Sequence, residues 1–337
     1  MNRKCTLLAV SLVLAGCQSM PMTSSERSIF DGQNSLLYRV QEQASSPQQA
    51  MRMAAVAYQG GALDQALYHY LRAIELDPDE YEAMVWVGRI HRERGNNHLA
   101  ELAFADVLQK RPEHLAALTE MGLLQLAMQQ PVSAREMLGK ALAMDQRRQG
   151  GEAGALRVDG KSPLRLYNGL GVMADLGNDF EEAAQYYRLA QQIEPRSALV
   201  ANSLAYSLYL AGKWSEAEAQ YRLGLSYDSR YEPLWRNYGL LLARMGRYEE
   251  ALSSFEQVES RAAASNDVGY VCLIEGKLDA AEQFFQSAID QSPAHYEMAW
   301  ENLQRVKQIR RLRQHGERGG EAEAFAVVPS EALKASP

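Results

Sequence analysis

Six histidines and one DGKS segment are the features of this sequence whose residue types could bind a metal or a phosphate. No two histidines have the H-E-x-x-H spacing that places two imidazoles and a general base on one helix face. The DGKS segment at residues 159–162 resembles the end of a phosphate-binding loop. That loop requires a preceding strand and a glycine where this chain has Ala155. The sequence therefore predicts no enzyme activity, no metal site and no cofactor.

The cysteines indicate a different chemistry. Residues 7–15 form an apolar run after Arg3 and Lys4. A membrane span needs roughly 20 apolar residues, so this run has instead the size and flanks of a secretory signal. The run ends in the letters LAGC, which resemble the bacterial lipobox, and this resemblance implies cleavage before Cys17 and lipidation of its thiol and amino group. The alternative is an ordinary cleaved signal followed by a cysteine without lipid.

The predicted lipid places the protein at a membrane. Each buried CH₂ contributes about 0.8 kcal/mol, so two or more acyl chains anchor a protein stably. The next residue is Gln18 rather than Asp, a pattern that resembles lipoproteins sorted to the outer membrane of Gram-negative bacteria. We therefore expect a lipid anchor at the periplasmic face of the outer membrane. Cys272 lies in the apolar pattern GYVCLIEG and is predicted to be a buried structural thiol.

The charge balance limits the class of partner. The chain has 35 basic and 42 acidic residues, and removal of residues 1–16 takes away two basic residues and no acidic one. The mature chain then has a net charge of −9, which disfavours binding to nucleic acid.

The elements that must position any site are repeats. The segments GALDQALYHYLRAIELDP, GNNHLAELAFADVLQKRP and GKLDAAEQFFQSAIDQSP can be aligned with one another. Pro78 and Pro112 are 34 residues apart, as are Ala183 and Ala217. In period and motif the chain resembles the tetratricopeptide repeat (TPR), which implies an all-α superhelix of stacked helix pairs. We count seven repeats, starting near residues 47, 81, 115, 164, 198, 232 and 262.

Small residues recur where the two helices of each predicted repeat cross. Bulky side chains at these positions would push the helices apart, and the large residue four positions after each second-helix alanine is expected to fill the space between neighbouring repeats. The first helices carry Ala54, Gly88, Gly122, Gly171, Ala205, Gly239 and Gly269, and the second helices Ala66, Ala100, Ala134, Ala183, Ala217, Ala251 and Ala281. The large residues are Tyr70, Phe104, Leu138, Tyr187, Tyr221, Phe255 and Phe285.

The array has two irregularities and a terminal extension. Residues 147–162 include four glycines and are expected to form a flexible insert. Ala251 and Ala281 are only 30 residues apart, so one helical turn is missing between repeats six and seven. Tyr296, Trp300, Leu303, Val306 and Ile309 form one apolar face, which predicts a capping helix. The expected organisation is a signal (1–16), a tether (17–46), repeats one to three (47–146), the insert (147–162), repeats four to seven (163–293), the capping helix (294–315) and a disordered tail (316–337).

The first helices of repeats four to seven carry the candidate binding residues. In TPR proteins, positions two, five, nine and twelve of each repeat line the concave groove. Asparagine recurs at or beside position five, although it costs perhaps 0.6 kcal/mol relative to alanine in a helix. Its amide can bind a peptide backbone, or it can link neighbouring helices of the array. The partner-binding candidates are Asn168, Asn202, Tyr206, Tyr209, Arg236, Asn237, Asn266 and Tyr270.

The lipobox, the repeats and the segments NSLAY, NDVGY and HYEMAWENLQRV together resemble the TadD family, the TPR lipoproteins of tight adherence (Tad, Flp pilus) assembly. This resemblance implies an outer-membrane lipoprotein that helps to build or localise a pilus secretin in a type II-like secretion machine. The expected partner is the secretin or a periplasmic assembly component. Two alternatives are a pilotin-like factor of type IV pili and a periplasmic adaptor that scaffolds peptidoglycan enzymes.

Overall fold

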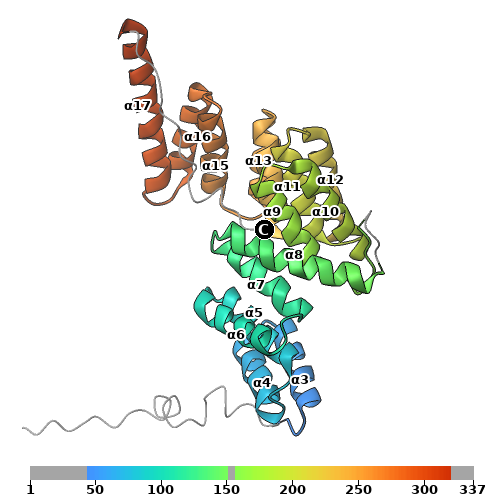
Figure 1. Cartoon of the computed structure of the whole chain (residues 1–337). Coiled ribbons are helices and arrows are strands. Elements are labelled where there is room, and N and C mark those ends of the chain that lie inside the picture. The colour runs from blue at the N-terminus through green and yellow to red at the C-terminus, as the bar shows by residue number, and fades with distance from the viewer. Residues whose placement is uncertain (1–43, 151–155, 320–337) are drawn as a thin grey trace, which may run out of the picture. The chain divides into compact units, whose positions relative to one another are not determined.

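The computed structural model describes residues 44–150 and 156–319. Within these residues the chain forms fifteen α-helices, α3 to α17, and no strand (Figure 1). The predicted all-α architecture of seven helix pairs and a terminal helix is therefore confirmed. The predicted signal and Cys17, with most of the tether, lie outside the described residues, and so do residues 320–337 of the predicted tail.

The helix bounds follow the predicted repeats. The first helices are α3 (Pro47–Gln59), α5 (Tyr81–Glu93), α7 (Leu115–Ala127), α9 (Leu164–Leu176), α11 (Ala198–Leu210), α13 (Glu232–Arg244) and α15 (Arg261–Ile274). The second helices are α4 (Leu63–Leu76), α6 (Asn97–Lys110), α8 (Pro131–Arg148), α10 (Phe180–Ile193), α12 (Trp214–Tyr227), α14 (Tyr248–Phe255) and α16 (Leu278–Gln291). The terminal helix is α17 (Glu297–Gly319).

The described residues divide into two compact units, the first ending at Asn96 and the second beginning at Asn97. The first unit holds α3 to α5, so the boundary falls inside the second predicted repeat. Its core is aromatic: the ring of Trp86 stacks on Tyr70 at 5.6 Å between centroids and meets Tyr58 edge to face at 4.8 Å. These contacts join α3, α4 and α5 across successive helices.

The second unit holds α6 to α17, and its helices from α7 to α16 pair as the repeats predict. In four pairs a large side chain of the second helix packs directly over a first-helix glycine. A β-carbon added to Gly171 would lie 2.5 Å from the ring of Tyr187, and one added to Gly239 would lie 2.9 Å from Phe255. The large residues therefore fill the crossing within their own repeat, whereas the sequence assigned them to the space between repeats. Contact between repeats also occurs, since the ring of Tyr221 stacks on Tyr238.

The missing turn between repeats six and seven falls in a second helix. α14 has eight residues, whereas α12 and α16 have fourteen each. Residues 256–260 then lead to α15, whose first turn is capped by the Ser260 hydroxyl, which accepts a hydrogen bond from the Ala263 amide. Because α14 is short, the loop of residues 256–260 occupies the place where a full-length second helix would continue.

The predicted insert differs from expectation over its described residues. α8 continues through Arg148, into the segment that was expected to be flexible. Residues 156–162 are bound back to this helix: both terminal nitrogens of Arg148 donate to Asp159 at 2.9 Å, and the Ser162 hydroxyl donates to the fully buried Asp145 at 2.7 Å. Asp159 and Ser162 of the DGKS segment thus belong to a side-chain network that connects the start of α9 to the end of α8.

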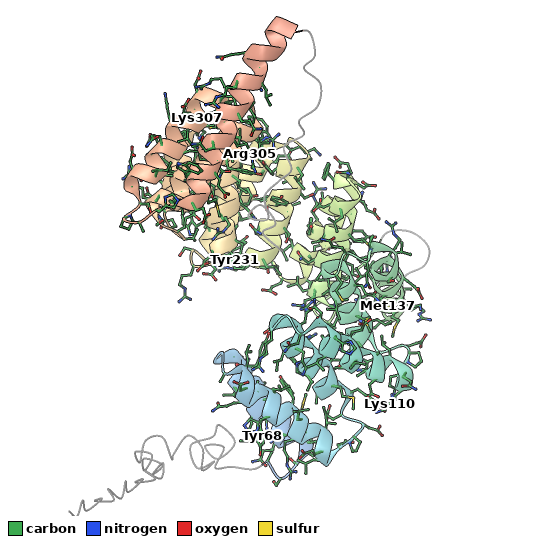
Figure 2. The ribbon with its side chains drawn as sticks, turned by 90° about the vertical axis from the view of Figure 1, so that its left-hand side faces the viewer. Tyr68, Lys110, Met137, Tyr231, Arg305 and Lys307 are labelled. Carbon is green, nitrogen blue, oxygen red and sulfur yellow. The ribbon has the colours of Figure 1, made fainter. Side chains whose placement is uncertain are left out.

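The terminal helix covers the last repeat, with contacts to α16 and α15. Figure 2 labels Arg305 and Lys307 on this helix. Its own residues Ala299, Leu303 and Val306 are buried, as a capping role requires. Trp300, expected on the same face, is 48% exposed because Ala299 occupies the inward position of that turn. The helix also begins three residues later and ends four residues later than the predicted range 294–315.

Candidate functional site: the first-helix face of repeats four to seven

The candidate binding residues lie on α9, α11, α13 and α15, which contact one another in that order. We use the term first-helix face for the surface formed by positions two, five, nine and twelve of these four helices. Each of these helices packs against the second helix of its own repeat, and the two helices cross at a glycine or alanine of the first helix. The spacing of side chains along the face is therefore set by the repeat packing rather than by loops.

The asparagine row links neighbouring helices. Asn168, Asn202, Asn237 and Asn266 are all less than 10% exposed. The Asn237 side-chain nitrogen donates to the Asn202 side-chain oxygen at 3.0 Å, which joins α13 to α11. These contacts are the ones expected if asparagine holds the repeats together. A role in binding peptide stays a prediction for these amides.

The row extends to a residue that the sequence analysis did not single out. The Asn302 side-chain nitrogen of α17 donates to the Asn266 oxygen of α15 at 3.1 Å. Asn302 is spaced 36 residues from Asn266, close to the repeat period. This spacing is the sequence feature from which Asn302 could have been predicted. The hydrogen bond shows that the terminal helix makes the same amide contact as the repeats. The side-chain oxygens of Asn168 and Asn237 are buried with no partner within the described residues.

The tyrosines differ in how much surface they leave accessible. Tyr206 and Tyr209 of α11 are half-buried, and their ring centroids are 5.8 Å apart. Arg244 of α13 donates to the Tyr209 hydroxyl at 3.2 Å and lies over its ring. Tyr270 is 5% exposed and belongs to the hydrophobic core of this unit. Of the three predicted tyrosines, Tyr206 and Tyr209 are therefore accessible to a partner, whereas Tyr270 is packed in the core.

A half-buried carboxylate that contacts α11 was missed from the sequence. Asp175, at position twelve of α9, accepts hydrogen bonds from the hydroxyls of Tyr187 at 2.7 Å and Ser207 at 2.6 Å. Burial raises the pKa of Asp175, and the two hydroxyl donors oppose the shift. A single aspartate near a helix C-terminus gives no pattern in the sequence, because its partners come from two other helices.

Exposed apolar side chains mark one edge of the first-helix face. Leu176, Leu210 and Ile274 are 66%, 42% and 42% exposed. They are the last residues of α9, α11 and α15, and α13 has Arg244 at the same place. Three aliphatic side chains at equivalent positions form a recurring exposed feature of the array.

Charged groups concentrate at the repeat-six end of the face. Arg236 of α13 pairs with Glu259 at 3.4 Å, and Arg244 pairs with Glu275 at 3.4 Å. Burial, followed by the charge of Asp267, raises the pKa of Glu259 to about 7. Arg236 was predicted to contact a partner, and in the structure its guanidinium already contacts a carboxylate.

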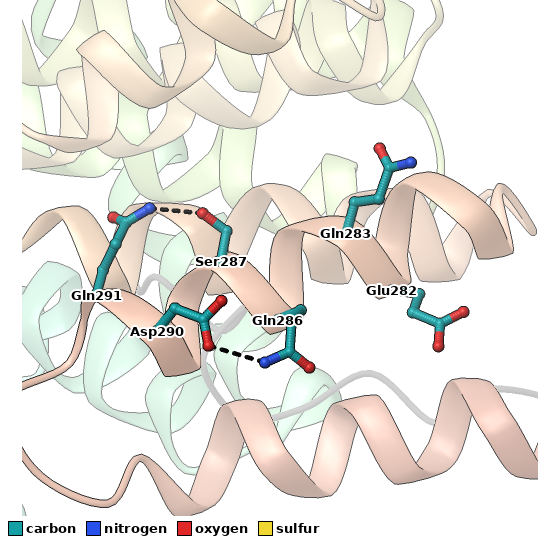
Figure 3. A pocket seen from close by; sticks show the side chains of 6 residues that line it. All are labelled: Glu282, Gln283, Gln286, Ser287, Asp290 and Gln291. Atoms are coloured by element: carbon teal, nitrogen blue, oxygen red, sulfur yellow. Dashed lines mark hydrogen bonds between the residues drawn. The ribbon is translucent and has the colours of Figure 1, made fainter.

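The hollow drawn in Figure 3 is polar and lies along the exposed side of one helix, α16. Its side chains pair along the helix at four-residue spacing: Gln286 donates to Asp290 at 2.9 Å, and Gln291 donates to Ser287. Residues from a single helix surface do not converge on a bound molecule as a ligand site requires.

Residues 44–150 and 156–319 contain neither a metal-binding cluster nor a membrane-spanning helix. No group of three or more histidine, cysteine, aspartate or glutamate side chains in these ranges is placed to hold a metal ion. None of the helices within them combines the length and apolar content needed to cross a bilayer. Cys272 is fully buried in α15, as its sequence pattern predicts.

Comparisons with known proteins find one curated relative and several solved structures that are similar to this chain. A curated relative, the probable UDP-N-acetylglucosamine–peptide N-acetylglucosaminyltransferase SPINDLY of Hordeum vulgare, is 30% identical over 110 residues; the match covers 31% of this chain and only 12% of that protein. Similar solved structures include a TPR protein of Parabacteroides merdae (17% identity, 78% of this chain and 100% of that one, TM-score 0.49). PilF of Pseudomonas aeruginosa is 19% identical, with 68% and 97% coverage and a TM-score of 0.49. PilW, described as a widely conserved type IV pilus biogenesis factor, is 17% identical, with 77% and 98% coverage and a TM-score of 0.48.

The family assignment comes from the repeats themselves. The family model for the tetratricopeptide repeat matches residues 51–114, 119–198 and 237–296, more than half of the chain. These ranges contain most of the helix pairs described above, including the glycine crossings of α9, α13 and α15. The chain therefore belongs to the tetratricopeptide repeat family.

Proposed function

We propose that the protein is a lipid-anchored TPR scaffold at the periplasmic face of the outer membrane, which assembles or localises a Tad (Flp) pilus machine of the type II-like secretion class. In this proposal Cys17 carries the lipid and the first-helix face binds a segment of the secretin or of a periplasmic assembly component. The lipobox supports the anchor, and the segments NSLAY, NDVGY and HYEMAWENLQRV support the pilus role.

The observation that carries the binding role is the accessible apolar surface of the first-helix face. Tyr206 and Tyr209 present half-buried rings next to the exposed Leu210, and Leu176 follows on the neighbouring helix. Aromatic and aliphatic side chains that are both held in place and accessible are typical anchors of protein recognition. The net charge of −9 expected for the mature chain favours a neutral or basic partner segment.

The partner is identified by crosslinking in membranes. The mature lipoprotein, expressed in its own bacterium, is crosslinked and purified, and the captured proteins are identified by mass spectrometry. We expect a secretin subunit or a periplasmic pilus component. Capture of murein hydrolases instead would favour the peptidoglycan-adaptor alternative and contradict the pilus role.

The binding surface is tested with two double variants and the captured partner. Leu176→Ala with Tyr209→Ala removes accessible anchors, and we expect binding to weaken on the order of a hundredfold with little change in melting temperature. Asn202→Ala with Asn237→Ala removes the amide link between α11 and α13, and here we expect a lower melting temperature with binding retained below it. If the first variant binds normally, the binding surface lies elsewhere. If the second loses binding at unchanged stability, the amides themselves bind the partner.

A further inference from the structure

A cluster of ionisable side chains lies at the junction of repeats six and seven, where α14 is shortened. Glu259 belongs to the loop of residues 256–260 that joins α14 to α15. Its carboxylate accepts from Arg236 of α13, with 3.4 Å between Nη1 and Oε2. Asp267 of α15 accepts from the side chain of Asn266 at 3.3 Å. The cluster therefore joins the loop, α13 and α15.

The charges of this cluster do not balance. Only 13% of the Glu259 side chain is exposed, and its Oε1 atom is buried with no hydrogen-bond partner. The charged groups that face Glu259 are Arg236 from α13 and Asp267 from α15, so two carboxylates face one guanidinium. From the segment before α17, the phenol of Tyr296 lies near both carboxylates, and their charges, after burial, raise its pKa. A buried carboxylate that lacks a second cation is stabilised when it takes up a proton.

We propose that Glu259, Asp267 and Arg236 form a proton-dependent junction, in which uptake of one proton by the carboxylate pair holds repeat seven and α17 more firmly against repeat six. The effect reaches α17 because Asn266, which donates to Asp267, also accepts from Asn302 of that helix. This inference concerns the fold of the array and does not depend on the proposed function.

The direction of the pH effect follows from the pKa of Glu259, which burial and Asp267 raise from 4.5 to about 7. The folded junction binds the proton more tightly than an opened one does. The stabilisation is therefore fully present below pH 4.5 and is lost as the pH rises to about 7; above that, both forms are ionised. From these two values, the equilibrium constant for opening is expected to rise on the order of a hundredfold across this range.

Cys272 provides a direct probe of opening. It is fully buried in α15, and the chain has three cysteines in all. In the full-length chain with Cys5→Ser and Cys17→Ser, the rate at which a pyridyl disulfide reagent labels Cys272, divided by the rate for a short unfolded peptide containing it, reports the opening equilibrium. Labelling is measured from pH 4.5 to 8.

The variants separate Glu259 from the other titrating groups. Glu259→Gln removes the charge in the same shape, and we expect opening that changes less than about threefold with pH and is much rarer than in the unsubstituted chain at pH 7. Asp267→Asn should shift the transition to lower pH, because it removes the second carboxylate. Glu256→Gln is the matched control in the same loop, where Glu256 pairs with the exposed Arg261 at 3.5 Å. His295→Gln is a second control, because His295 precedes Tyr296 in the segment before α17.

The outcomes decide the proposal. A rise in opening with pH that both control variants keep and Glu259→Gln abolishes supports it. Opening that is independent of pH in the unsubstituted chain overturns it. So does a rise that persists unchanged in Glu259→Gln, because other groups would then be responsible.

Discussion

At the scale of single residues, glycine and asparagine recur in this array for different physical reasons. A glycine at a helix crossing is required by volume: the ring of Tyr187 occupies the place where a β-carbon of Gly171 would lie. The asparagines are required by hydrogen bonding, because an amide buried between two helices needs a donor or acceptor on the other helix. Asn202 and Asn237 meet this requirement for each other. Recurrence at the repeat period thus reflects packing in one case and polar satisfaction in the other.

Gly171→Ala tests the packing role. The added β-carbon would lie 2.5 Å from a fully buried ring, so we expect the free energy of unfolding to fall by about 1–3 kcal/mol in urea titrations. Gly139→Ala is the control, because this glycine lies inside α8 and nothing lies within 4 Å of its added β-carbon. Helix propensity predicts that the control gains up to about 1 kcal/mol. Equal effects of the two substitutions would show that the crossing does not need glycine.

At the scale of elements, the connection between α8 and α9 combines glycine-rich sequence with a buried polar network. Asp145 accepts from the hydroxyls of Tyr167 and Ser162, both at 2.7 Å, and pairs with Arg148 at 2.6 Å. Arg148 in turn holds Asp159. Because Tyr167 belongs to α9, the network fixes the start of repeat four to the end of repeat three across the connection.

Asp159→Asn is expected to loosen this connection. Arg148 holds the pKa of Asp159 well below its usual range, so the carboxylate is ionised at neutral pH and its charge is lost in the variant. In limited proteolysis we expect the first cut of the unsubstituted chain within residues 147–162, and a several-fold faster cut in the variant. Asp290→Asn, on the exposed face of α16, should leave the rate unchanged. Primary cleavage within residues 198–260 would contradict the prediction.

At the scale of the whole molecule, the described residues form two compact helical units, and the anchor is predicted from the sequence that precedes them. A repeat array buries its core only through contacts between neighbours, so both ends of a unit need covering. α17 covers one such end through Ala299, Leu303 and Val306.

Cys17→Ser tests the anchor in cells. Without the thiol no lipid can be attached, so we expect the variant to leave the outer-membrane fraction and to lose the mass of the acyl chains. The matched control is Cys272→Ser, whose buried thiol lies within α15 and should not affect sorting. The measurements are membrane fractionation and intact-mass spectrometry. A Cys17→Ser protein that remains in the outer membrane with unchanged mass would rule out the lipoprotein assignment.

The sequence by itself determined the helices, their order and the small residues at their crossings, because helical periodicity and small residues at a fixed period are local properties of the chain. It also predicted that Cys272 is buried. The irregular helix α14 could be anticipated from the shortened spacing between Ala251 and Ala281.

Only the tertiary structure decided the polar contacts. The partner of Asn237 is 35 residues away, and Asp175 finds its donors on two other helices. Glu259 faces groups from α13 and α15. Such contacts depend on distances between helices, which periodicity does not specify, whereas the apolar pattern follows from which side of each helix must be buried.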